Sequence, residues 1–209
     1  MEIILIRHGD PDYAHDTLTP KGHEEAKKLA SFLADKPIDA IFQSPNGRAR
    51  HTCAYTAEIK GMEPVTMDWL REVGIMRGKL YLWNAPGSLF LSDPSLPTYE
   101  NCLKPDGAMP EGKSQFDLVS KGFDKVAASF GYVKQGHLYR VENPNDKTLA
   151  FFCHHGVIAT LLSYLIHWAL PLTFIHSYID PTGLTRLKMI ERDGVAYPKM
   201  LAFNSLAHL

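Results

Sequence analysis

The sequence predicts an α/β protein, a three-layer sandwich in which a mixed, mainly parallel central sheet is flanked by helices. Apolar runs at residues 2–6, 38–42 and 148–153 contain β-branched or aromatic side chains and have the length of buried parallel strands. Helical patterns alternate with these runs, which is typical of a parallel sheet. With 209 residues, the chain suits a single domain, residues 1–209, that buries a sizeable core.

The first helix is expected to begin at Thr19 and Pro20. Threonine can cap the first turn of a helix, and proline is tolerated at the first helical position. The apolar residues that follow recur at helical spacing and give this helix one face that can cover the sheet. These residues are Ala26, Leu29, Ala30 and Leu33.

Three further helices and one hairpin are expected. The helices start near residue 48, near residue 114 and near residue 157, and the last of them should run to about residue 170. The runs 184–190 and 195–203 flank Asp193-Gly194, a dipeptide that favours tight hairpin turns. The hairpin predicts an antiparallel edge on an otherwise parallel sheet.

A proline-rich segment interrupts this alternation at about residues 77–113. Prolines at this frequency prevent long regular elements, and long irregular loops in compact domains often act as lids. We therefore interpret the segment as a lid or substrate-specificity insertion. The alternative is a surface excursion that is packed by its own aromatic side chains.

Charged and titratable residues follow the predicted strands directly. Arg7 and His8 follow the first strand, Arg48 follows the second, and His154-His155 follow the third. The carboxyl ends of parallel strands meet at one edge of a sheet, where ligands bind. Arginine matches the oxygens of a phosphate and histidine can act as a nucleophile near neutral pH, so the pattern indicates a histidine directed at phosphorus. Neighbouring cations are expected to lower the pKa of His8 and keep its ring neutral.

Several short motifs resemble those of one known family over nearly the whole chain. We identify the chain as similar to the histidine phosphatase superfamily, in its phosphoglycerate mutase-like branch. The motifs are Arg7-His8-Gly9, Leu18-Thr19-Pro20-Lys21-Gly22, Ser44 followed by Arg48-Ala49 and Thr52, Leu70-Arg71-Glu72, and His155-Gly156.

The resemblance implies a role for each matching residue. His8 is the nucleophile that becomes phosphorylated, Glu72 is the proton donor, and His155 completes the catalytic set. Arg7, Arg48 and His155 are implied to hold the phosphate. The reaction then needs no cofactor and no metal. In the family, the region that corresponds to residues 77–113 overhangs the phosphate site.

Two positions depart from the family pattern. His154 stands where a small residue is usual, and Lys113 stands where glutamate is more common. Together with Asp10, these residues are candidates for contacts with the substrate. An ammonium at position 113 would attract a second anionic group, which predicts a substrate with a carboxylate or a further phosphate.

The predicted function is hydrolysis of a small phosphomonoester through a phosphohistidine on His8. The nearest alternative is a phosphoglycerate mutase-type transfer, which uses the same residues, but the chain is shorter than typical cofactor-dependent mutases. A catalytically inactive phosphoester-binding module is a third possibility, which the intact set of catalytic residues disfavours. His15 and Asp16 imitate the His-Asp pair of related acid phosphatases, yet they lie just after the first motif, so we predict an ordinary loop pair.

Composition narrows the partners and the compartment. The formal charge is −1 and no basic stretch occurs, so nucleic acid is not an expected partner. Cys53, Cys102 and Cys153 lack metal-ligand spacing, and adjacent histidines such as His154-His155 point to opposite sides of an extended chain, so no metal site is expected. The short first apolar run excludes a signal peptide or membrane span there, and we expect a cytoplasmic enzyme.

Overall fold

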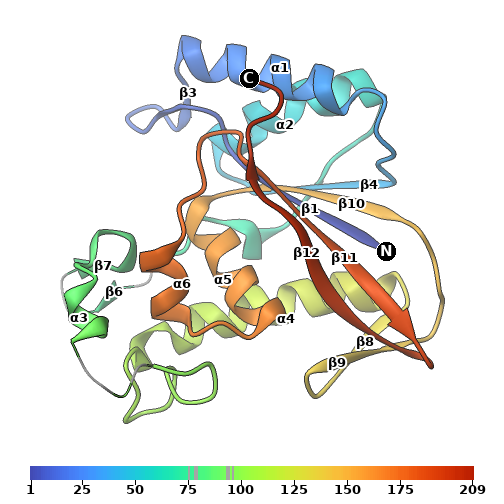
Figure 1. Cartoon of the computed structure of the whole chain (residues 1–209). Helices are drawn as coiled ribbons and strands as arrows, with labels where there is room; N and C mark the ends of the chain where they lie inside the picture. Colours follow the sequence, from blue (N-terminus) through green and yellow to red (C-terminus); the bar gives the residue numbers. More distant parts are fainter. Residues whose placement is uncertain (75, 78–79, 93–94, 96) are drawn as a thin grey trace.

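A computed structural model describes residues 1–74, 76–77, 80–92, 95 and 97–209, with the backbone alone at 76–77 (Figure 1). Its centre is an 8-stranded sheet in the order β5-β4-β10-β1-β11-β12-β9-β8. The strands are β1 (Glu2–Arg7), β4 (Ala40–Gln43), β5 (Val65–Thr66), β8 (Tyr132–Gln135), β9 (Leu138–Val141), β10 (Thr148–Cys153), β11 (Leu184–Arg192) and β12 (Val195–Ser205).

The sheet is parallel on one side and antiparallel on the other. β1 pairs in parallel with β10, which in turn pairs in parallel with β4, and β4 with β5. On the other side of β1, each strand pairs antiparallel with its neighbour, in the order β1, β11, β12, β9, β8. The prediction of a mixed sheet with an antiparallel edge is confirmed.

Helices cover the parallel half of the sheet on both faces (Figure 1). On one face lie α1 (Pro20–Leu33) and α2 (Gly47–Lys60); on the other lie α4 (Lys113–Ser129), α5 (His155–Ile166) and α6 (Leu170–His176). Alternate residues of β1 pack against the helices on opposite faces of the sheet, because successive side chains of a strand point to opposite faces. Ile4 and Ile6 belong to the cluster beneath α1 and α2, whereas Ile3 and Leu5 belong to the larger cluster around α4 and α5.

The expected single helix over residues 157–170 is two helices. α5 ends at Ile166 because His167 adopts a left-handed conformation with φ 57°, and α6 begins only at Leu170. The sequence has no glycine at this break, so its apolar pattern is continuous and predicts one helix. The hairpin β8–β9 was not predicted either; its turn contains Gly136, which has φ 59°.

The proline-rich segment is built of short elements. It contains β7 (Leu80–Tyr81), which pairs with β6 (Met76–Arg77), then η2 (Leu82–Asn84), α3 (Ser88–Leu91) and η3 (Pro110–Gly112). Its side chains Leu82, Phe90, Cys102 and Met109 are buried in the larger core cluster. The segment is thus anchored to the core rather than packed only on itself, and its action as a lid stays a prediction.

Two small features complete the fold. β2 (Pro11–Asp12) and β3 (Thr17–Leu18) form a two-stranded ribbon between β1 and α1, and η1 (Asp68–Leu70) precedes Glu72. Among the described helices, none combines the length and the apolar character that crossing a bilayer requires.

Candidate active site

Three strands end at the same edge of the sheet and bring the predicted residues together. Arg7 closes β1 and pairs in register with Cys153 at the end of β10, while Phe152 of β10 pairs with Gln43 at the end of β4. His8 and His154 therefore leave neighbouring parallel strands side by side, and their ring centroids lie 5.1 Å apart.

His8 is held with one ring nitrogen bound. Nδ1 lies 2.8 Å from the carbonyl oxygen of Gly9, and a carbonyl only accepts, so Nδ1 carries the proton. Nε2 then holds the free lone pair. The side chain is 1 % exposed, and burial lowers the pKa of His8 to about 3, with Arg7 and Arg48 contributing further lowering. The expected neutral ring is thus supported, but burial and not the neighbouring cations is the main cause.

His155 has the opposite arrangement of its ring. The backbone N–H of Ile179 donates to Nδ1 over 3.4 Å, which places the proton of the neutral ring on Nε2. Burial, assisted by Arg7, lowers the pKa of His155 to about 4. At neutral pH the two histidines are therefore both neutral, and His155 presents an N–H donor where His8 presents a lone pair.

The two arginines are fixed at the edges of the same site. Nη1 of Arg7 donates to the carbonyl oxygen of Ile179, and Nη1 of Arg48 donates to Oδ1 of Asp16 over 2.6 Å. Both side chains are largely buried. Their Nε atoms and Nδ1 of His154 are buried without a hydrogen-bond partner among the described residues. Buried donors without partners cost free energy, so a bound anion would lower that cost.

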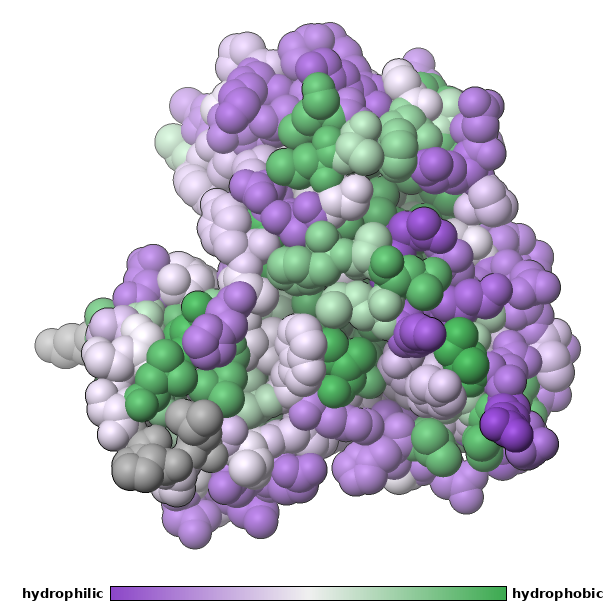
Figure 2. Space-filling model, viewed as in Figure 1, coloured by the Kyte–Doolittle hydropathy of each residue, from purple (hydrophilic) through white to green (hydrophobic). Residues whose placement is uncertain are grey.

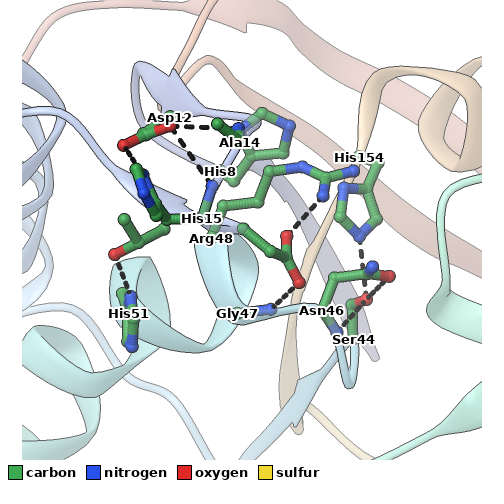
Figure 3. A network of polar contacts seen from close by, with 12 residues as sticks. His8, Asp12, Ala14, His15, Ser44, Asn46, Gly47, Arg48, His51 and His154 are labelled. Carbon is green, nitrogen blue, oxygen red and sulfur yellow. Dashed lines mark hydrogen bonds and ion pairs between the residues drawn. The ribbon is translucent and has the colours of Figure 1, made fainter.

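Asp16 is a positioning residue that the sequence analysis missed. Oδ2 accepts the backbone N–H of Gly47 over 2.7 Å while Oδ1 binds Arg48, so one carboxylate caps α2 and orients its arginine. Asp16 has φ 47°, and a Cβ at position 47 would lie 2.0 Å from its carbonyl oxygen. His15 and Asp16 lie in the turn between β2 and β3, as predicted, and His15 binds Asp12 over 2.7 Å (Figure 3).

Glu72 follows η1 in the chain, is partly buried and lies against the first turn of α5. Its Oε1 accepts the backbone N–H groups of Val73 and Gly156, each over 3.1 Å. Burial nonetheless dominates and raises the pKa of Glu72 to about 7, against weaker lowering by those bonds and by Arg48 and Arg7. The side chain can thus exist as a neutral acid and as a carboxylate near neutral pH.

His154 is completely buried beside His8. Its Nε2 lies 2.8 Å from Oγ of Ser44, and the same Oγ receives the backbone N–H of Asn46 at the start of α2 (Figure 3). Burial, followed by the charges around it, holds the pKa of His154 well below its usual value. His154 thus packs against the ring of His8 and does not line the cavity described below.

Two other candidates lie elsewhere. Nζ of Lys113 pairs with Asp117 one turn along α4, over 2.5 Å, and the side chain is largely exposed. Oδ2 of Asp10 accepts the hydroxyl of Thr19 over 2.6 Å, so this carboxylate supports the cap of α1. Neither residue lines the cavity described next, and the position of Lys113 gives no support to a second anionic group on the substrate.

A cavity of about 650 Å³ opens over the arginines. Arg7, Arg48, Glu72 and His155 line its inner end, and residues from η2, α6 and the loop around Tyr13 line the rest. The molecule is hollowed between the β2–β3 ribbon and the lobe around α3 and α6 (Figure 2). Within the part of the chain that the structure describes, no three His, Cys, Asp or Glu side chains are grouped so as to hold a metal ion.

The arginines and histidines gathered at these strand ends form a site that can bind a phosphate group. The family model of the histidine phosphatase superfamily (branch 1) matches residues 3–81. This match bears out the resemblance to the superfamily that the motifs predicted.

Known proteins similar to this chain include phosphatases and a probable mutase. A "putative phosphoserine phosphatase 2" of Hydrogenobacter thermophilus is 25% identical over 201 residues, which cover 90% of this chain and 89% of that protein. A "probable phosphoglycerate mutase" of Serratia proteamaculans is 25% identical over 135 residues, 56% of this chain and 58% of that protein. The crystal structure of an Entamoeba histolytica phosphoserine phosphatase in complex with phosphoserine superposes with a TM-score of 0.67 at 20% identity, covering 100% of this chain and 98% of that one.

Proposed function

We propose that the protein hydrolyses a small phosphomonoester through a phosphohistidine on Nε2 of His8. The observation that carries the proposal is that one site holds both a neutral histidine with a free ring nitrogen and a carboxyl group that can be protonated near neutral pH. His8 is buried, neutral and bonded through Nδ1, which leaves Nε2 free, while Glu72 is partly buried with its pKa raised to about 7. One residue is prepared to attack and the other to give up a proton.

In the first step, Nε2 of His8 attacks phosphorus and the P–O ester bond breaks. Neutral Glu72 transfers its proton to the departing oxygen, so the alcohol leaves uncharged. Arg7, Arg48 and the Nε2–H of His155 stabilise the charge on the phosphoryl oxygens. The phosphorylated ring of His8 is positively charged, and its Nδ1–H bond to the Gly9 carbonyl stabilises that charge.

In the second step, the carboxylate of Glu72 takes a proton from water, and the resulting hydroxide attacks the phosphohistidine. The P–N bond breaks, inorganic phosphate leaves, and both residues return to their starting states. Glu72 therefore serves first as an acid and then as a base, which its pKa near 7 favours at physiological pH.

A panel of phosphomonoesters tests this function. We expect free phosphate and the free alcohol in equal amounts, with turnover by the parent protein and none by His8→Ala. A mutase would instead isomerise 3-phosphoglycerate with little release of phosphate, and an inactive binding module would release none. Either of these two results would overturn the proposal.

A further inference from the structure

Three large aromatic side chains stand at the outer end of the catalytic cavity. Tyr13 is 65% exposed, Tyr178 is 60% exposed and Trp83 is 36% exposed, although all three line the cavity. Arg7 and Arg48 at its inner end are buried. The cavity is therefore divided into a charged floor and an aromatic mouth.

The aromatic rings are held close to the phosphate-binding groups. The guanidinium of Arg7 lies 5.5 Å from the ring centroid of Tyr178, and that of Arg48 lies 5.4 Å from the ring centroid of Tyr13. Trp83 stacks on Tyr81, with centroids 4.7 Å apart and ring planes 6° apart. Such contacts keep the rings in defined positions. The rings therefore lie next to the place where the arginines would hold a phosphate.

Among the described residues, this lining contains no lysine and no arginine other than Arg7 and Arg48. Beyond Arg7, Arg48 and Glu72, its titratable members are the two tyrosines and the histidines His155 and His176, while Lys113 is paired on α4. A carboxylate on the alcohol would lose its hydration at this mouth without a charged partner there, which disfavours its binding.

The cavity is also too large for a phosphate alone. Its volume of about 650 Å³ falls in the range of pockets that enclose drug-sized ligands. The side of the mouth formed by Phe174 and Ile175 of α6 is apolar. The alcohol part of the substrate must fill most of this space, and an apolar ring suits it best.

We infer that the physiological substrate is a phosphomonoester of an uncharged, ring-bearing alcohol, whose ring packs between Trp83, Tyr178 and Tyr13. This inference rests on the proposed function and specifies its substrate class. It replaces the expectation of a substrate with a second anionic group, which depended on Lys113.

The experiment compares esters whose leaving groups are all primary alkyl alcohols, so that leaving-group chemistry does not decide the result. The probes are 2-phenylethyl phosphate, glycerol phosphate and phosphoserine. We expect kcat/KM for 2-phenylethyl phosphate to exceed that for each of the other two by about tenfold or more, the value of one well-packed aromatic contact. A preference for phosphoserine would overturn the inference.

Variants locate the preference in the mouth of the cavity. Trp83→Ala should lower kcat/KM for 2-phenylethyl phosphate about tenfold, mainly through KM, and lower it much less for glycerol phosphate. Trp168→Ala is the matched control, because Trp168 is 44% exposed and does not line this cavity. Equal losses on both esters in Trp83→Ala would contradict the inference.

The outcome separates the substrate class from the function itself. para-Nitrophenyl phosphate, which has a good leaving group, serves as an independent assay of hydrolysis. If it is hydrolysed while 2-phenylethyl phosphate is not preferred, the substrate class is wrong and the function stands. If it is not hydrolysed, the proposed function fails.

Discussion

Glu72 and Gly156 are joined by a hydrogen bond of 3.1 Å from the backbone N–H of Gly156 to Oε1 of Glu72. Gly156 is the second residue of α5, and His155 is the first. A Cβ at position 156 would lie 2.7 Å from the same Oε1, so glycine is needed for this approach. One bond thus fixes the acid of the proposed reaction against the helix that carries its second histidine.

The role of Glu72 as an acid predicts a dependence on the leaving group. Glu72→Gln should slow the release of alkyl alcohols by about 10²- to 10⁴-fold, the usual contribution of a positioned general acid, and should spare aryl phosphates. Pre-steady-state release of the alcohol measures the first step alone. Glu58→Gln, on the exposed face of α2, is the control and should change neither rate. Equal losses on alkyl and aryl esters would show that Glu72 is not the acid.

The raised pKa of Glu72 predicts the pH dependence of kcat/KM for alkyl phosphates. The neutral acid is lost as the pH rises through about 7, so kcat/KM should fall above that value. His8, with a pKa of about 3, stays neutral throughout the range from pH 5 to pH 9 and adds no acidic limb there.

Aryl phosphates control for ionisation of the substrate's own phosphate, which occurs near pH ~6. They should lack the alkaline fall, and so should alkyl esters in Glu72→Gln. A fall of the same size in that variant would assign the titration to another group.

The dual contact of Asp16 predicts a specific loss of phosphate affinity. Asp16→Ala removes the partner of Arg48 and the cap of α2, so KM and the inhibition constant of inorganic phosphate should rise about tenfold. Asp12→Ala is the matched control from the same loop, because the carboxylate of Asp12 binds His15 and neighbouring backbone groups and has no hydrogen bond or ion pair to Arg48. If both variants weakened phosphate binding equally, the effect would belong to the loop as a whole.

The burial of His154 predicts an effect on stability. His154→Ala leaves a cavity beside His8 and removes one of the hydrogen bonds of the Ser44 hydroxyl, so the free energy of unfolding should fall by about 2–4 kcal/mol. His154→Phe keeps the ring and should lose less. Urea unfolding measures both, and a His154→Ala variant as stable as the parent would contradict the packing described.

Much of the fold followed from the sequence because the signals were local. β10 spans the predicted residues, and α1 begins at the predicted proline with Thr19 as its cap. The gathering of Arg7, His8, Arg48 and His155 was also predictable, since the carboxyl ends of adjacent parallel strands must meet.

The rest depended on tertiary contacts that no local pattern reports. Asp16 itself adopts the left-handed conformation, in a loop that lies against the start of α2, and from there it binds Arg48. Similarly, no glycine marks the break between α5 and α6 at His167. Lys113 forms an ion pair with Asp117 of its own helix. Charge at a position indicates chemistry, but the direction in which the side chain points is decided by the fold.

The most direct test of the mechanism is to map the phosphoryl group in the protein during turnover. We would quench the reaction with alkali, which preserves phosphohistidine, and locate the group by tandem mass spectrometry. The account predicts a phosphoryl group on His8 of the parent protein and none in His8→Ala, whose fold should be intact by circular dichroism. A phosphoryl group on His154 or His155, or turnover by His8→Ala at the parental rate, would contradict it.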